Sequence, residues 1–211
     1  MSTFAKRERL LLADLLETAG PEAPTLCEGW QTRDLAAHVV VRERRLDAAG
    51  GLLLKQLAPR LDRAMEEFAG KPYEELIQLI RTGPPRFSPF QLKQIDEMSN
   101  TTEFYVHAED VRRAQPDWTP RELDPVFQDA LWSRLERTAR LMGRGAPTGL
   151  VLRRPDGRTV VADRGTPVVT VTGEPSELLL FLYGRQDAAK VDLDGEQEAV
   201  ERLHGSKQLG I

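Results

Sequence analysis

The chain has 211 residues, 40% of them hydrophobic and 29% charged, and a formal net charge of −4 at pH 7. This length fits one large domain or two small ones, and the composition is typical of a soluble globular protein. The acidic balance disfavours nucleic acid as a partner, because phosphate binding depends on clustered Lys and Arg. No apolar run approaches the roughly 20 residues of a membrane span, and a single cysteine, Cys27, fits a reducing compartment. We therefore expect a cytoplasmic protein.

The first two-thirds of the sequence has the apolar spacing of helices, interrupted by Gly and Pro. Thr32 is the expected N-cap of one helix, since Asp34 follows in the first turn, at the positive end of the helix dipole. Helices of this length joined by short loops favour an antiparallel bundle with functional side chains in its core. The expected helices cover about residues 4–19, 32–50, 52–68, 73–81 and 89–114, and a last one begins at Pro120 or Pro125 and ends at Met142.

The pattern changes at residues 143–147, where Gly and Pro interrupt the helical spacing. Residues 150–162 contain two strand-like runs around Pro155-Asp-Gly157, and Asp-Gly is a strong hairpin signal. We therefore expect an α+β protein with a helical domain over residues 1–145 and a small α+β domain over residues 146–211. The other expected elements of the second domain are strands at 167–172 and 190–194 and helices at 175–183 and 195–204.

Two of the three histidines lie where they could hold a metal ion. Glu103 and His107 are four residues apart, so both side chains project from one face of a helix. His38 lies among apolar residues of another helix, where an unpaired imidazole would lose its hydrogen bonds to water at a cost of about 1–3 kcal/mol. Two imidazoles and one carboxylate are the ligand set of a catalytic zinc site, which leaves a fourth position for water or substrate.

Each of these residues also has a plainer interpretation. A Glu-x-x-x-His pair is common on solvated helix faces and is less specific than a helical His-Glu-x-x-His motif. His38 could be a core histidine that other hydrogen bonds satisfy. Asn100 and Asp110 continue the polar stripe of Glu103, either as partners that orient metal ligands or as exposed helix residues. The basic run at residues 42–45 is interpreted mainly as a solvated helix face, with binding of an anionic ligand as the alternative.

Two segments resemble the metal-site pattern of the mycothiol-dependent maleylpyruvate isomerase-like family: CEGWQTRDLAAH, which ends at His38, and EFYVHAED, which begins at Glu103. Proteins of that family have a DinB-type four-helix bundle followed by a small α+β domain that resembles sterol carrier proteins. Residues 169–185 are similar to that second domain, so the resemblance covers nearly the whole chain in order. It implies an antiparallel DinB-like four-helix bundle whose zinc ligands are His38, Glu103 and His107.

The resemblance also implies a function. A transferase or isomerase of this kind uses a low-molecular-weight thiol, mycothiol, to act on a small electrophilic substrate. Zinc would turn the bound thiol into a thiolate at neutral pH. Two alternatives stay open: a metal-dependent hydrolase, and a non-catalytic, metal-stabilised protein that binds an apolar ligand or a partner. The oligomeric state cannot be derived from the sequence.

Three further residues are assigned by their positions. Arg185 follows Gly184 at a helix end, where the resemblance allows a basic residue that faces the bundle and binds the cofactor, and where an exposed cap residue fits equally well. Cys27 is best explained as a buried structural cysteine near Trp30, in preference to a nucleophile or a fourth metal ligand. His204 is expected in the last turn of the final helix, where a cation is mildly favourable.

Overall fold

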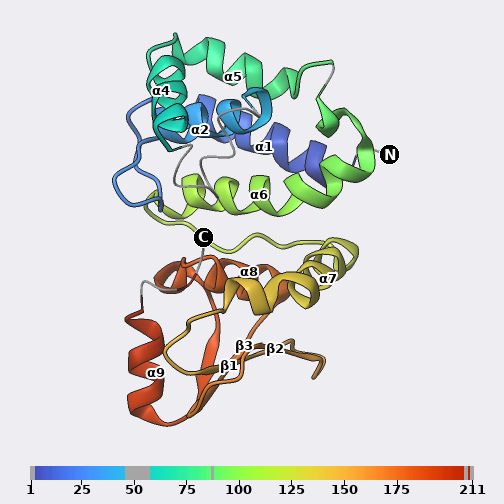
Figure 1. The fold of residues 1–211 in the computed structure, drawn as a ribbon, viewed down its shortest axis with the longest axis vertical. Coiled ribbons are helices and arrows are strands. Elements are labelled where there is room, and N and C mark those ends of the chain that lie inside the picture. Colours follow the sequence, from blue (N-terminus) through green and yellow to red (C-terminus); the bar gives the residue numbers. More distant parts are fainter. Residues whose placement is uncertain (1–2, 46–57, 87, 207–208, 210–211) are drawn as a thin grey trace. The chain divides into compact units, whose positions relative to one another are not determined.

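The computed structural model describes residues 3–45, 58–86, 88–206 and 209. The chain divides into two compact units, Met1–Thr119 and Pro120–Ile211 (Figure 1). The regular elements described in the first unit are helices, and the second unit combines helices with a four-stranded sheet. This arrangement confirms the predicted α+β class, with a helical part first and a small mixed part after it. None of the described helices is long and apolar enough to cross a bilayer.

The first unit is built around α1, which packs along α6 and also contacts α5 (Figure 1). α2 packs against α4 and α5, so the apolar faces of these helices enclose one core. The predicted start of a helix near residue 52 lies outside the described residues. The elements are α1 (Phe4–Ala19), α2 (Thr32–Arg44), α4 (Ala58–Ala69), α5 (Tyr73–Thr82), the 3₁₀ turn η3 (Pro89–Gln91) and α6 (Lys93–Arg113).

The start of α2 differs from the sequence expectation. The prediction of Thr32 as N-cap is wrong, because Gln31 caps the helix and Asp34 Oδ2 accepts a hydrogen bond from the Gln31 backbone N–H at 2.9 Å. The hydroxyl of Thr32 instead donates to the carbonyl of Gly20, just beyond the end of α1. This bond ties the start of α2 to the end of α1 and thereby helps to fix the direction in which α2 leaves the loop.

The second unit contains a mixed sheet with the strand order β2-β1-β3-β4. β1 is antiparallel to β2 and parallel to β3, and β4 closes the other edge antiparallel to β3. The predicted hairpin is confirmed, with Gly157 in its turn at a φ of 90°, a left-handed conformation that glycine adopts without strain. The elements are α7 (Pro125–Met142), β1 (Gly149–Arg153), β2 (Thr159–Asp163), β3 (Val168–Thr172), α8 (Pro175–Leu182), η4 (Gln186–Ala188), β4 (Asp192–Asp194) and α9 (Gln197–His204).

α7 belongs to the second unit. The sequence places the domain boundary near residue 145, after this helix, whereas the compact units divide between Thr119 and Pro120. The reason is packing: α7 contacts α8 and β2, and Phe127 and Leu131 on its inner face are fully buried. An apolar helix face is readable in a sequence, but the partner that the face covers is not.

Asp124 caps α7, and its loss is expected to destabilise the second unit. Its Oδ1 accepts a hydrogen bond from the backbone N–H of Phe127 at 2.9 Å, and Pro125 occupies the first helical position. We expect Asp124→Ala to lower the free energy of unfolding by about 1 kcal/mol, and Asp124→Ser, which keeps an acceptor, by less than about 0.5 kcal/mol. Urea denaturation of the three proteins measures both changes. Equal losses in the two variants would contradict the capping role.

Candidate metal centre

Two helices bring the predicted metal ligands together. His38 projects from α2, and Glu103 and His107 project from consecutive turns of α6. Glu103 Oε1 lies 3.3 Å from His38 Nε2 and 3.2 Å from His107 Nε2. The three donor atoms all lie within 4.8 Å of one another. Within residues 3–45, 58–86 and 88–206, no fourth His, Cys, Asp or Glu donor lies that close to all three.

The separations in this cluster are compatible with a metal coordination shell as well as with hydrogen bonds. Charge-assisted hydrogen bonds between a ring N–H and a carboxylate are usually about 2.7–2.9 Å long. Two ligand atoms at the ordinary zinc distances, on two corners of a tetrahedron, are about 3.3 Å apart. The observed 3.2 and 3.3 Å match the second value, and one carboxylate oxygen faces both ring nitrogens. The residues therefore fit a divalent metal ion.

The burial of the cluster shifts the proton affinities of its members. Burial lowers the pKa of His38, so this ring is neutral at pH 7. Burial opposes the charge on Glu103, but hydrogen bonds with His107 and His38 hold its pKa well below the usual value. For His107, burial favours the neutral ring, yet hydrogen bonds with Asp110, Cys27 and Glu103 raise its pKa well above 6.5. A metal ion that binds the His107 ring therefore has to displace a proton.

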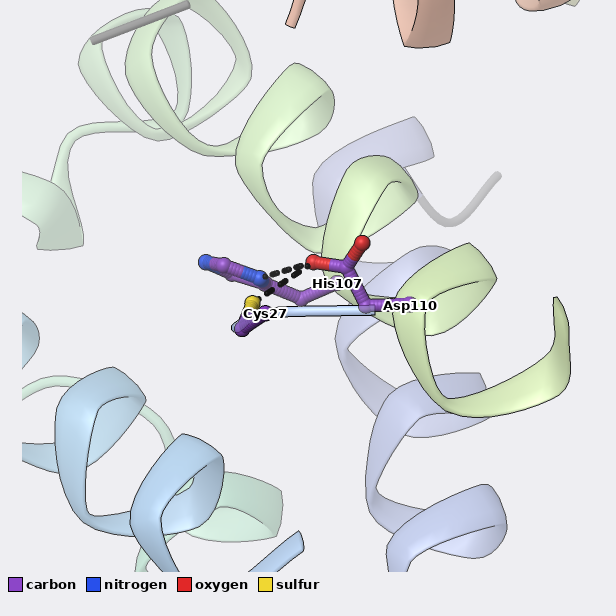
Figure 2. Close-up of side chains that lie close together, drawn as sticks. All are labelled: Cys27, His107 and Asp110. Carbon is purple, nitrogen blue, oxygen red and sulfur yellow. Dashed lines mark hydrogen bonds and ion pairs between the residues drawn. The ribbon is translucent and has the colours of Figure 1, made fainter. Parts of the chain in front are cut away.

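Asp110 orients His107. Its Oδ2 faces His107 Nδ1 (Figure 2), at a distance of 2.9 Å, and the Asp110 side chain is completely buried. A hydrogen bond at Nδ1 fixes the ring and leaves Nε2 directed at Glu103, the arrangement that metal-binding histidines commonly have. Cys27 donates to the same carboxylate oxygen, with Sγ 3.2 Å from Oδ2 (Figure 2). The structure thus brings Asp110 to the place expected of a residue that orients a ligand.

Asn100 acts on the cluster through Arg42, a member of the basic run at residues 42–45. Its Oδ1 accepts a hydrogen bond from Arg42 Nη1, and Arg42 Nε lies 3.3 Å from Glu103 Oε1. Arg42 Nη2 also donates to the carbonyl of Ser99 at 3.1 Å. Asn100 therefore positions a guanidinium group beside Glu103. The main interpretation of Arg42 as part of a solvated face is wrong, although its spacing of four residues from His38 was a usable signal.

A buried chain of charges supports this arrangement. Asn100 Nδ2 donates to Asp96 Oδ1 at 2.7 Å, and Arg9 on α1 donates to the same oxygen at 3.0 Å. Arg9 also donates to Glu43 on α2 at 2.6 Å. Burial raises the pKa of Glu43, against the opposing effect of the Arg9 charge. The positions of Arg42 and Asn100 are therefore anchored in the core that α1, α2 and α6 share.

The remaining candidate residues are Arg185, His204 and Cys27. Arg185 belongs to the second unit, where its Nη1 donates to the carbonyl of Tyr183 at 2.6 Å. His204 is in the last turn of α9, as expected, with Nδ1 3.6 Å from Asp187 Oδ1. Cys27 is partly buried against the core of the first unit, together with Trp30. The prediction of a structural cysteine near Trp30 is therefore compatible with its packing but omitted the bond to Asp110.

Two crystal structures are similar to the chain over most of its length. One is mycothiol-dependent maleylpyruvate isomerase, with a TM-score of 0.56 and 18% sequence identity, and the other is a histidine-to-alanine variant of it, with 0.59 and 17%. Each alignment covers 93% of this chain and 97% of the other chain. The chain has the fold of mycothiol-dependent maleylpyruvate isomerase. At this identity the likeness establishes the fold alone. No protein-family model and no curated protein sequence matches the chain.

Proposed function

We propose that this protein is a zinc-dependent enzyme that uses mycothiol, a low-molecular-weight thiol, to act on a small electrophilic substrate, as a thiol transferase or an isomerase. One observation carries the proposal: donor atoms of His38, Glu103 and His107 lie within 4.8 Å of one another in a chain that has the fold of a mycothiol-dependent isomerase. A zinc ion bound by three protein ligands keeps a fourth position, and there it would supply a Lewis acid at which a thiol loses its proton.

The side chains around the cluster have distinct tasks in this proposal. Asp110 accepts the Nδ1–H of His107 and so keeps its Nε2 directed at the metal position. The ring of Trp30 lies 5.2 Å from the ring of His38, centroid to centroid, and shields one side of that ligand from water. The Glu103 side chain is 23% exposed, against 10% for each histidine. The cluster is therefore most open to small molecules beside Glu103.

Arg42 supplies a positive charge at this open side. Its side chain is 17% exposed, and Glu103, Asn100 and Ser99 each face one of its nitrogens. A guanidinium group has five N–H donors, so the two terminal nitrogens of Arg42 keep donors for a further acceptor. In our proposal this group attracts an anionic substrate or the thiolate. It would also stabilise negative charge that develops on the electrophile when the sulfur adds to carbon.

The same addition serves both reactions. The thiolate electron pair forms a carbon–sulfur bond, and the π electrons of the unsaturated substrate move onto its carbonyl oxygen. In an isomerase, rotation about the resulting single bond and expulsion of the thiolate return the double bond in the other geometry. In a transferase, protonation of the adduct leaves the sulfur attached. The residues near the metal position serve either outcome, and the substrate decides between them.

The proposal predicts a change in the metal shell when the thiol binds. We expect zinc-loaded Cys27→Ser protein to show only nitrogen and oxygen neighbours by X-ray absorption, and to gain one sulfur at about 2.3 Å when mycothiol is added. The Cys27→Ser background removes the protein's only thiol, and the serine hydroxyl is expected to donate to Asp110 in its place. An oxygen analogue of mycothiol without the thiol is the control and should add no sulfur neighbour.

The outcome separates the proposed enzyme from the alternatives. If no sulfur enters the shell and electrophile turnover proceeds without thiol, the transferase and isomerase proposal is wrong and a metal-dependent hydrolase replaces it. If sulfur is absent and no turnover occurs with or without thiol, a non-catalytic metal-stabilised protein is the better description. Sulfur entry together with thiol-dependent turnover supports the proposed function.

A further inference from the structure

The loop between α1 and α2 is attached to α6 at Asp110. The backbone N–H of Leu26 donates to the carbonyl of Asp110 at 3.1 Å. The thiol of Cys27, the next residue, donates to the side chain of Asp110, with Sγ 3.2 Å from Oδ2 (Figure 2). Leu26 therefore binds the main chain of Asp110, and Cys27 binds its carboxylate.

The loop is also held together internally. The hydroxyl of Thr25 donates to the carbonyl of Trp30 at 2.9 Å and accepts from the backbone N–H of Cys27 at 3.2 Å. The backbone N–H of Trp30 donates to the carbonyl of Cys27 at 2.9 Å. Cys27 and Trp30 thus move together, and the indole of Trp30 lies beside the imidazole of His38. The attachment of Cys27 to α6 therefore also holds the indole of Trp30 beside His38.

The Asp110 carboxylate is shared between the loop and a proposed metal ligand. The oxygen that accepts from the Cys27 thiol is also the oxygen 2.9 Å from His107 Nδ1 (Figure 2). Two donors on one oxygen restrict the rotation of the carboxylate, so Oδ2 stays directed at the ring. The Cys27 thiol is therefore linked to both histidines of the cluster. Asp110 connects it to His107, and Trp30 connects it to His38.

The lengths of these contacts argue against Cys27 as a metal ligand. Cys27, His107 and Asp110 do form a second group of possible donors within 4.8 Å of one another. A sulfur and an oxygen bound to one tetrahedral zinc ion would be about 3.5 Å apart, and a nitrogen and an oxygen about 3.3 Å. The observed separations of 3.2 and 2.9 Å are shorter and are those of hydrogen bonds.

We propose that Cys27 is a positioning residue of the metal centre: its thiol fastens the loop to Asp110 and so holds both proposed histidine ligands in place without binding the metal. This inference rests on the proposed metal centre. It assigns a function to the protein's only cysteine that depends on its hydrogen-bond donor. Serine, which keeps a donor of similar size, should therefore replace it, and alanine should not.

The test compares wild type, Cys27→Ala and Cys27→Ser in two measurements. Competition with a chromophoric chelator gives the zinc dissociation constant. We expect Cys27→Ala to bind zinc about 10–100-fold more weakly, the usual effect of losing a partner that orients a ligand, and Cys27→Ser to stay within about 3-fold of wild type. Hydrogen exchange of the Leu26 amide in the metal-free proteins should be about 3-fold or more faster in Cys27→Ala alone, because the loop has lost one of its bonds to α6.

Each contrary result has one meaning. Unchanged zinc affinity and unchanged amide exchange in Cys27→Ala would overturn the positioning function while leaving the proposed enzyme intact. Cobalt-loaded wild type that shows a sulfur-to-metal charge-transfer band without added thiol, lost in Cys27→Ser, would make Cys27 a ligand and also overturn the proposal. Wild type without any affinity for divalent ions would instead overturn the metal centre itself.

Discussion

Replacing His107 by alanine is expected to abolish metal binding. The purified wild type should carry one divalent ion per chain, and His107→Ala should carry only background metal after dialysis. The variant keeps two of the three donors, His38 and Glu103. Loss of an outer partner alone weakens metal affinity by about 10–100-fold, so loss of a ligand should exceed about 100-fold. Elemental analysis after removal of any affinity tag, together with chelator competition, measures both quantities.

The third histidine supplies the control. His204 lies in the second unit with a half-exposed side chain, and His204→Ala removes an imidazole while leaving all three proposed ligands in the chain. This variant should retain wild-type metal content. Equal metal content in wild type and in His107→Ala would show that the ligand assignment is wrong. A loss of metal in His204→Ala would point to adventitious binding at surface imidazoles.

Replacing Arg9 by methionine should lower the free energy of unfolding more than the Asp124 and Arg7 substitutions. Arg9 is buried and donates to two carboxylates, Glu43 at 2.6 Å and Asp96 at 3.0 Å. Methionine fills a similar volume but leaves both carboxylates without their cation. Breaking a buried ion pair from one side typically costs about 3–5 kcal/mol. Urea denaturation followed by far-ultraviolet circular dichroism should show this decrease in the free energy of unfolding at pH 7.

The decrease in the free energy of unfolding caused by Arg9→Met should become smaller as the pH falls. The pKa of Glu43 is raised in the folded protein by burial, so the folded state takes up a proton at a higher pH than the unfolded chain. Such a group contributes most to stability below its unfolded pKa and loses that contribution as the pH rises through the folded value. The charge and hydrogen bond of Arg9 oppose this rise, so without Arg9 the pKa of Glu43 should be higher still. The variant then gains more stability than wild type as the pH falls, and the Arg9→Met deficit should be smaller at pH 5 than at pH 7. Arg7→Met on the exposed side of α1 is the control, with an expected change within about 0.5 kcal/mol.

The sequence predicts the elements of this fold better than their caps. Most helices and all four strands lie where Gly, Pro and apolar spacing placed them, since these signals are local. The N-cap of α2 is Gln31 and not the predicted Thr32, whose hydroxyl donates to the carbonyl of Gly20, twelve residues away in sequence. Capping rules consider only neighbouring residues, so they cannot predict a contact between residues that are distant in sequence.

The same distinction applies to the candidate centre. The spacing of Glu103 and His107 predicts that both face one side of a helix, and the family resemblance adds His38. The structure brings these three together, and their function as metal ligands stays a proposal until metal is measured. Neither signal could predict that Asn100 acts through Arg42, or that the Cys27 thiol meets Asp110, because each of these pairs joins different segments across the core.

The pairing of α1 with α6 has a consequence for how the first unit forms. The backbone N–H of Ala5 donates to Glu97 Oε1 at 3.0 Å across 92 residues of sequence. α6 has no single apolar stripe, and several of its polar side chains are completely buried. Docking of α6 therefore requires partners that are already in place, and contacts this distant in sequence slow folding. During synthesis, the part of α1 that packs on α6 stays uncovered until α6 has left the ribosome, so a chain that stops before residue 93 is expected to aggregate more readily.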